Sequence, residues 1–348
     1  MSETIPVRPD ERFDEARLAD YLRDKLPGAD APLTVEQFPG GAANLTYLLR
    51  FGAHEYVLRR PPLGQLAQGA HDMSREYRVL SVLYQQFPYA PRAYHLCEDV
   101  GVIGAPFIIM ARQRGVVVRR NMPPTYETIP DAPRQLAVAL VDRLADFHAV
   151  DYKALRLADL GRPAGFVARQ IDGWYKRWQK AKVDDVPAME RLHTWLNAHQ
   201  PPENPPTLLH NDYKLDNTMF SPDHPSKMVA IFDWYMCTLG DPLVDVGTLL
   251  AYWSEPGDPD CFRGLLGMPG AAFPVREELV ARYAAQSGRD VTAISFYHVL
   301  ALYRLVVIVA QIYVRYHRGQ TQDQRFASFG GMIPIIADHA LRLAKTSG

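Results

Sequence analysis

The stretch His210-Asn211-Asp212-Tyr213-Lys214-Leu215-Asp216-Asn217, with Asp233 farther along, decides how this chain is interpreted. It has the form H-x-D-x-x-x-x-N followed by D, which is the layout of a phosphoryl-transfer site. Such a site needs one carboxylate that orients an attacking hydroxyl, and oxygen ligands that hold magnesium. Asp212 is the candidate for the first task, and Asn217 and Asp233 are candidates for the second.

Short strands are expected around this motif. Residues 207–209 form an apolar run before it, residues 218–220 follow it, and residues 228–232 lead to Asp233. Such strands would bring the oxygen-bearing side chains to one edge. In the alternative interpretation, these residues only form turns and a helix cap. Turn chemistry explains neither the spacing nor the strand before each acidic residue, so we favour the catalytic interpretation.

The composition excludes several classes of protein. Of 348 residues, 22% are charged and 47% hydrophobic, and 38 Lys and Arg balance 39 Asp and Glu. The length suits two lobes, and the balanced charge gives no support to a nucleic-acid or membrane partner. The three separated cysteines, Cys97, Cys237 and Cys261, argue against disulfides and a zinc site. Since no signal peptide is visible at the N-terminus, we expect a cytoplasmic protein.

Two lobes with different patterns are predicted, which makes the fold class α+β. The first lobe, residues 1–110, combines a helix over 10–25, strands over 33–38, 45–51 and 56–59, a helix over 74–86, and strands over 93–98 and 106–110. The second lobe, residues 111–348, is mainly helical, and its apolar segment 301–314 is interpreted as a buried helix. Helices are expected there over 132–150, 165–181, 186–198, 241–252, 277–285, 294–316 and 331–345.

The chain resembles the aminoglycoside phosphotransferase and choline kinase-like enzymes, which are small-molecule kinases with a protein-kinase-like fold. The resemblance extends from Phe38 to about Trp253 and implies ATP and Mg as cofactors. It implies Asp212 as the catalytic base, with Asn217 and Asp233 as metal ligands. The segments L-L-H-N-D-Y-K-L-D-N, F-D-W, L-G-D-P-L-V-D-V-G and Y-V-L-R-R-P-P look most like the group associated with acyl-CoA dehydrogenases.

Two segments of the first lobe are predicted to contact the nucleotide. Gly40, Gly41 and Asn44 lie between the first two strands, where small residues let backbone N–H groups approach phosphates. A tight hairpin also uses glycine, and the G-x-G-x-x-G of protein kinases is absent. Met110 ends the strand whose backbone would face the adenine.

A cation on the third strand is expected to hold the α- and β-phosphates. Arg59 stands where a Lys is usual, and its guanidinium can bind phosphate bidentately. Arg60 would point to the opposite face of the strand. Glu76, on the following helix, is either the ion-pair partner of Arg59 or a solvated residue.

Several other polar residues near the motif are interpreted as structural. His210 would orient the loop, and His148 would end a helix. Asp241 would cap a helix that also carries Asp245. The resemblance implies that this segment braces the metal-binding loop. Tyr235 replaces the acidic residue that the family often carries after Asp-Trp, which leaves the hydrogen bonding around Asp233 open.

The acceptor is a small-molecule hydroxyl, and the resemblance implies a hydroxyacyl-CoA thioester, with a 4-hydroxyacyl-CoA as one candidate. Aminoglycoside, choline and homoserine are alternatives. A CoA thioester favours basic surroundings, whereas an aminoglycoside favours acidic ones. One predicted helix with its flanks either binds the acceptor or is a solvated face with an apolar stripe; it carries Arg162, Arg169, Lys176, Arg177, Lys180 and Lys182, with Trp174, Tyr175 and Trp178.

A pseudokinase that binds nucleotide and acts through protein contacts is the alternative from another class. The arginine in place of lysine and the missing glycine motif favour it, whereas the intact Asp212, Asn217 and Asp233 argue against it. Oligomeric state and the choice between ATP and GTP stay open.

Overall fold

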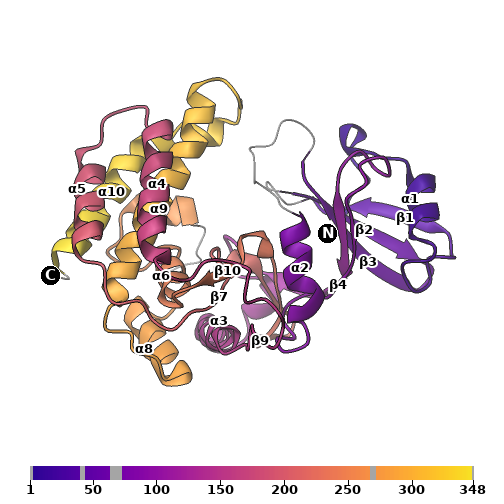
Figure 1. Ribbon diagram of the computed structural model, residues 1–348, viewed down its shortest axis with the longest axis horizontal. Coiled ribbons are helices and arrows are strands. Elements are labelled where there is room, and N and C mark those ends of the chain that lie inside the picture. Colours follow the sequence, from indigo (N-terminus) through magenta and orange to yellow (C-terminus); the bar gives the residue numbers. More distant parts are fainter. Residues whose placement is uncertain (1–2, 40–43, 63–72, 267–271, 347–348) are drawn as a thin grey trace. The chain divides into compact units, whose positions relative to one another are not determined.

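The computed structural model describes residues 3–39, 44–62, 73–266 and 272–346 (Figure 1). Its contacts divide the chain into two units, each described here by itself. The first unit is Met1–Gly115 together with Val229–Cys237, and the second is Val116–Met228 together with Thr238–Gly348. The segment that carries Asp233 therefore belongs to the first unit. The predicted division after residue 110 into nucleotide-binding and catalytic lobes stays a prediction.

A five-stranded antiparallel sheet forms the centre of the first unit. Its strand order is β1-β2-β3-β5-β4, and α1 and α2 flank it (Figure 1). A 3₁₀ turn, η4, lies in the segment that carries Asp233. The bounds are β1 Leu33–Gln37, β2 Leu45–Phe51, β3 His54–Arg60, β4 Ala93–Cys97, β5 Phe107–Ala111, α1 Glu15–Leu22, α2 Met73–Leu83, η1 Pro9–Glu11 and η4 Trp234–Met236.

Side chains of β3 alternate between the two faces of this sheet. Tyr56 and Leu58 join the apolar core that contains Leu18 and Leu22 of α1. Arg59 points to the other face, where it meets Glu76 of α2. The period-two alternation of a strand thus decides that Arg59, and not Arg60, faces α2.

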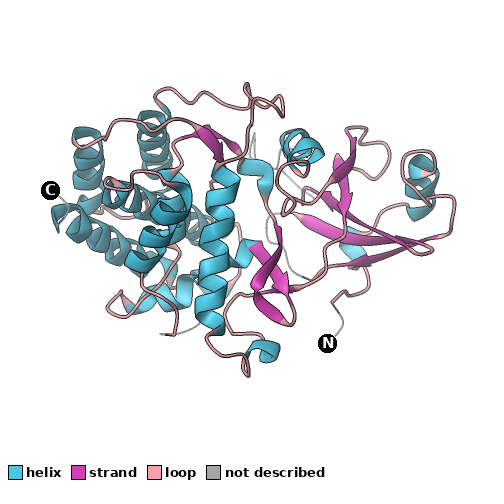
Figure 2. Ribbon diagram, turned by 90° about the horizontal axis from the view of Figure 1, so that it is seen from below, coloured by secondary structure: helices cyan, strands magenta, loops and turns pink. Residues whose placement is uncertain are grey.

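The second unit is mainly helical (Figure 2). Its helices are α3 Ala132–His148, α4 Phe166–Ala181, α5 Pro187–Ala198, α6 Leu243–Ala251, α7 Asp260–Leu266, α8 Arg276–Ser287, α9 Ile294–His317 and α10 Phe329–Thr346. Its shorter elements are β6 Val116–Val117, β7 Thr207–Leu209, β8 Thr218–Ser221, β10 Thr238–Gly240, η2 Pro124–Tyr126, η3 Leu215–Asn217 and η5 Gln324–Phe326. The strand β9, His224–Ile231, begins in this unit, and its residues from Val229 onward belong to the first unit. The strands β6, β8 and β9 form one small sheet, and β7 pairs with β10 in another.

The helix α9 is the core of this unit and packs against α6, α10 and α4. Among the described residues it alone is long and apolar enough to cross a membrane, but 78% of its most apolar window is buried inside the protein. A helix buried to this extent is a core helix, as expected from the sequence. Gly247 lets α6 approach closely, because a Cβ there would clash with the carbonyl of Tyr297 on α9.

The expected elements are present, with small differences at their ends. The first helix is shorter than expected, because residues 9–11 form a 3₁₀ turn and α1 spans only Glu15–Leu22. The strands β6 and β10 and the helix α7 were not expected. Each has seven residues or fewer, which is too short for a periodic pattern to show.

Candidate active site

The carboxylate of Asp212 is held from both sides by its own loop. Lys214 donates to Oδ1 from 3.0 Å, and the amide of Asn217 donates to Oδ2 from 2.8 Å. The same amide also donates to the backbone carbonyl of Asp212, again from 2.8 Å. The Asp212 side chain stays 21% exposed, so its remaining lone pairs are open to an incoming hydroxyl.

A buried carboxylate fixes the backbone just before Asp212. Asp245 of α6 accepts hydrogen bonds from the backbone N–H groups of His210, at 2.6 Å, and Asn211, at 2.7 Å. Asn211 adopts a left-handed conformation with φ of 64°, which is uncommon for a residue other than glycine. The bonds to Asp245 help to hold this strained residue.

Two histidines make hydrogen bonds that support the loop. The backbone N–H of Asp212 donates to Nδ1 of His210 at 3.3 Å, which agrees with an orienting role. His148 lies 3.4 Å from Oδ2 of Asp245 and 2.7 Å from the Tyr283 hydroxyl. Burial lowers the pKa of His148, so its ring is neutral near pH 7. Asp245 and His148 thus support the loop that precedes Asp212. The sequence interpretation had expected Asp245 to brace the metal-binding loop and His148 only to end a helix.

Lys214 and Tyr252 were not among the predicted site residues. Lys214 Nζ lies 4.7 Å from the centre of the Tyr252 ring, besides its bond to Asp212. Burial opposes the charge of Lys214, but the neighbouring Tyr252, Asp212 and Asp216 outweigh it, so the pKa of Lys214 is raised. Lys214 is therefore a cation beside the Asp212 carboxylate. A lysine inside the catalytic-loop motif itself was a signal that the sequence interpretation did not use.

The donor atoms of Asn217 suit magnesium. Its Nδ2 is used in the bonds to Asp212, which assigns the amide orientation and leaves Oδ1 as an acceptor with no hydrogen bond among the described residues. Magnesium prefers oxygen and takes only one or two protein ligands beside phosphates and water. Within the described parts of the chain, no three His, Cys, Asp or Glu residues converge on a metal position.

In the first unit, Arg59 is paired with two carboxylates. Its guanidinium lies 2.6 Å from Glu76, the partner suggested by the sequence, and also contacts Asp233. Burial opposes the charge of Arg59, but Glu76 and Asp233 outweigh it, so the pKa of Arg59 is raised. Arg59 thus joins Glu76 and Asp233 through two ion pairs. The role of Arg59 and Glu76 in nucleotide binding stays a prediction.

The backbone places Asp233 at the end of β9 in an unusual conformation. Its φ is 66°, again left-handed, and its side chain is 31% exposed. The next residue, Trp234, is fully buried and donates from Nε1 to the carbonyl of Ile231 at 2.7 Å. The anchored tryptophan thus turns the chain so that the carboxylate stays partly open, as a metal ligand requires.

The other predicted nucleotide contacts are only partly described. Gly40 and Gly41 lie outside the described residues. Asn44 is buried at the start of β2, and Met110 pairs with Val57 in the sheet. Their contacts with a nucleotide stay predictions.

The side chain of Arg60 is on the opposite face from Arg59, as expected. It donates to the carbonyls of Glu11, at 2.6 Å, and Ile103, at 3.0 Å, and to the hydroxyl of Tyr47. These contacts are structural.

The interpretation of the basic and aromatic helix as a binding face is corrected for its tryptophans. Trp174 and Trp178 of α4 are buried, so they belong to the apolar stripe of the helix. Arg169 donates to the carbonyls of Ala164 and Arg162 at the start of the helix. All six basic side chains of the predicted set are exposed: Arg162, Arg169, Lys176, Arg177, Lys180 and Lys182.

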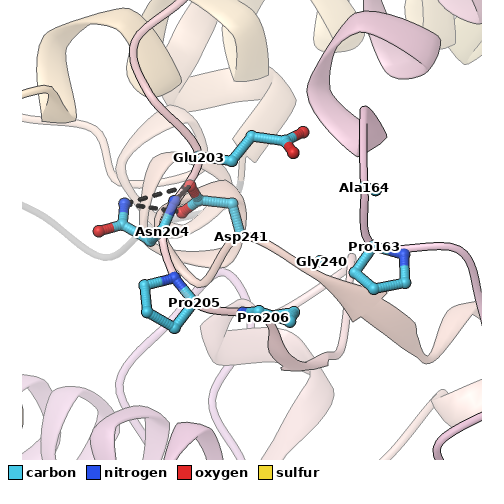
Figure 3. A pocket seen from close by; sticks show the side chains of 8 residues that line it. All are labelled: Pro163, Ala164, Glu203, Asn204, Pro205, Pro206, Gly240 and Asp241. Atoms are coloured by element: carbon cyan, nitrogen blue, oxygen red, sulfur yellow. Dashed lines mark hydrogen bonds between the residues drawn. The ribbon is translucent and has the colours of Figure 1, made fainter.

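A hollow beside Asp241 has no free acidic group (Figure 3). Asp241 accepts from the backbone and side chain of Asn204, from the backbone N–H of Leu243 and from the Tyr297 hydroxyl. Glu203 accepts from the backbone at the start of α4. Asp241 therefore accepts a hydrogen bond at the start of α6, as the expected capping role implies, although α6 itself begins at Leu243. Its other contacts are with Asn204 and Tyr297, and bracing of the metal-binding loop by Asp241 stays a prediction. The hollow, whose lining is shown in the figure, is structural.

Comparison with known proteins identifies the family of the chain. The model of the phosphotransferase enzyme family matches residues 34–285. The chain belongs to this family. Its antiparallel N-terminal sheet and mainly helical remainder form the kinase-like fold of the family, as predicted. The solved structure of a Ralstonia eutropha protein, provisionally named an aminoglycoside phosphotransferase, is 31% identical with a TM-score of 0.81, over 96% of this chain and 99% of that one.

Two more distant structures show the fold alone. Choline kinase from Cryptosporidium parvum has a TM-score of 0.64 at 12% identity, over 96% of each chain. An aminoglycoside phosphotransferase in complex with AMP-PNP and hygromycin B has a TM-score of 0.59 at 16% identity, over 94% of this chain and 98% of that one.

Similar curated proteins carry acyl-CoA dehydrogenase names. The chain is 32% identical to acyl-CoA dehydrogenase family member 11 of Pongo abelii over 99% of its length, and 31% identical to family member 10 of Mus musculus. It spans 45% and 32% of the lengths of these relatives, respectively. Its likeness is thus to one region of larger proteins.

Proposed function

We propose that this phosphotransferase uses ATP and magnesium, in the cytoplasm, to phosphorylate the hydroxyl of a hydroxyacyl-CoA, with a 4-hydroxyacyl-CoA as the leading candidate. One observation carries the proposal. Asp212 is partly exposed, and Lys214 and Asn217 hold its carboxylate in one orientation. A carboxylate fixed in this way suits the alignment of a hydroxyl for attack on phosphorus.

Each residue then has a definite task. Asp212 accepts a hydrogen bond from the acceptor hydroxyl and takes its proton as the bond to phosphorus forms. Lys214 places a positive charge beside the position of the transferred group. Arg59 exchanges its bond with Asp233 for the phosphates of the nucleotide, while Glu76 keeps its guanidinium in place. Asn217 and Asp233 offer oxygen ligands to magnesium, which neutralises the charge of the phosphates when it is bound.

The acceptor is inferred from relatives and from charge. Proteins named acyl-CoA dehydrogenases contain a region like this chain over almost its whole length. A kinase joined to such an enzyme suits a CoA thioester as substrate, because phosphorylation turns a hydroxyl into a leaving group for elimination. The exposed basic residues Lys176, Arg177, Lys180 and Lys182 agree with an anionic acceptor, whereas an aminoglycoside would favour acidic surroundings.

The test is ADP release with ATP and magnesium against 4-hydroxyvaleryl-CoA, 3-hydroxybutyryl-CoA, choline, homoserine and kanamycin. Turnover confined to the hydroxyacyl-CoAs supports both the reaction and the acceptor class. Turnover on choline or kanamycin keeps the kinase and rejects the CoA acceptor. No turnover, with nucleotide binding still seen by thermal shift, favours a pseudokinase.

A further inference from the structure

Arg304 is a buried cation on the central helix α9 and contacts the catalytic loop. Its side chain is in the core, at 5% exposure. One terminal nitrogen donates to the backbone carbonyl of Asn211 at 3.0 Å, and the other donates to the Thr248 hydroxyl at 3.3 Å. The guanidinium carbon also lies 5.4 Å from the ring centre of Trp174.

This cation has neutral hydrogen-bond acceptors only. Within the described parts of the chain, no carboxylate lies at ion-pair distance from Arg304. Burial lowers the pKa of Arg304, although an arginine stays charged in proteins. A buried charge without a charged partner is unfavourable for folding. A contribution to folding stability therefore does not by itself explain why position 304 is an arginine.

Arg304 donates its hydrogen bond to the peptide group that directly precedes Asp212. The Asn211 carbonyl belongs to the peptide bond that leads to Asp212, and Asn211 itself has the left-handed φ of 64°. Asp245 accepts from the N–H of Asn211 at 2.7 Å, and Arg304 donates to its carbonyl. The strained residue is therefore fastened at both of its peptide groups, by an anion on one side and a cation on the other.

We propose that Arg304 is a positioning residue for the phosphotransferase reaction: it fixes the Asn211–Asp212 peptide so that Asp212 meets the acceptor hydroxyl. The inference on catalysis rests on the proposed function. Thr248 sets the direction of the guanidinium, since its own hydroxyl donates to the Val244 carbonyl at 2.8 Å and leaves lone pairs for Arg304. An arginine can serve both acceptors through its two terminal nitrogens, whereas a lysine has a single ammonium.

The kinetic test uses Arg304→Met, Arg304→Lys and a matched control, Arg60→Met. Arg60 is also buried and donates to backbone carbonyls and a hydroxyl, but to those of Glu11, Ile103 and Tyr47 in the first unit. Arg304→Met should lower kcat on the order of 100-fold, because a small misplacement of a reacting group has that effect, and KM for ATP should change less than about threefold. Arg304→Lys should recover part of kcat, while Arg60→Met should lower Tm with kcat per folded molecule unchanged. The proposal is wrong if Arg304→Met keeps kcat, or if Arg60→Met lowers kcat equally.

A second readout does not depend on any substrate. Amide hydrogen exchange of a peptide that covers residues 208–218 should be faster in Arg304→Met than in Arg60→Met at equal distance below Tm, because the loop is released. If exchange is faster in Arg304→Met but the wild type shows no turnover on the proposed acceptors, Arg304 still positions the loop and the proposed acceptors are wrong. Equal exchange in the two variants would overturn the role of Arg304.

Discussion

The two units each contain a buried arginine beside a proposed reacting group, but the surroundings of the two cations differ. Arg59 in the first unit is paired with two carboxylates, Glu76 and Asp233. Among the described residues, Arg304 in the second unit donates only to a backbone carbonyl and a hydroxyl. The first cation can exchange one partner for a phosphate and keep the other. The second has no carboxylate at ion-pair distance in the described parts of the chain, so it suits a fixed role in a preformed loop.

The two arginines differ in whether their contacts must rearrange when a nucleotide and a metal bind. The Arg59–Asp233 contact must open if Asp233 is to bind a metal and Arg59 a phosphate. The loop around Asp212 is already held by Asp245, Lys214, Asn217 and Arg304. Variants in the second unit should therefore change the rate of the chemical step, and variants in the first should change nucleotide binding.

The largest effect is expected for Asp212→Asn. This variant keeps the shape and the bond to Lys214 but cannot take a proton, so kcat should fall roughly 1000-fold. Steady-state ADP release with a hydroxyacyl-CoA measures it, and thermal shift with ATP serves as the control for nucleotide binding. An unchanged rate would remove Asp212 from the reaction.

Lys214→Met should have the next largest effect. The loss of the charge beside Asp212 should lower kcat about 100-fold, with KM for ATP less affected, because the charge acts where phosphoryl charge develops. Lys214→Arg should recover part of the rate. Stopped-flow measurement of a single turnover separates this step from product release. A rise in KM with an unchanged kcat would place Lys214 in binding alone.

Arg59→Met should act mainly on the nucleotide. Its loss leaves Glu76 and Asp233 without their cation, so KM for ATP should rise about tenfold and Tm should fall. Arg59→Lys keeps the charge but loses the bidentate geometry. Its KM for ATP should therefore lie between the values of the wild type and of Arg59→Met. Isothermal titration with AMP-PNP and magnesium measures the affinity. Unchanged affinity in Arg59→Met would contradict the exchange of partners proposed for this residue.

The smallest effect concerns His298, a buried group that stays neutral. It lies in the core of α9, its Nε2 has no hydrogen-bond partner among the described residues, and burial lowers its pKa to about 3. Since the folded protein favours the neutral ring, the stabilisation is complete above pH 6.5 and is lost as pH falls toward 3. The free energy of unfolding should drop by about 1.4 kcal/mol per pH unit in this range on account of this group.

The matched variant for this prediction is His298→Gln, which does not titrate. Urea unfolding from pH 7 to pH 4 should show a smaller loss in the variant than in the wild type. If the free energy of unfolding falls equally with pH in the two proteins, the pKa of His298 is not lowered by folding. Burial would then not keep this core histidine neutral.

The sequence predicted the order of most elements and the motif residues because both leave periodic or spaced patterns. Asp212, Asn217 and Asp233 are recognised from spacing, and the partner of Arg59 from the helix after β3. Contacts between distant segments leave no such pattern. The bond of Arg304 to Asn211, the buried state of Trp174 and the position of Tyr252 beside Lys214 depend on how helices pack, so they required the structure.

The most direct test of the account is the identity of the product. Phosphorus NMR of wild-type protein with ATP, magnesium and 4-hydroxyvaleryl-CoA should show a new phosphate monoester on the acyl chain, with one ADP formed for each ester. The Asp212→Asn variant under the same conditions should show neither signal. ADP with inorganic phosphate and no ester, or an ester formed equally by both proteins, would contradict phosphoryl transfer to the hydroxyl through Asp212.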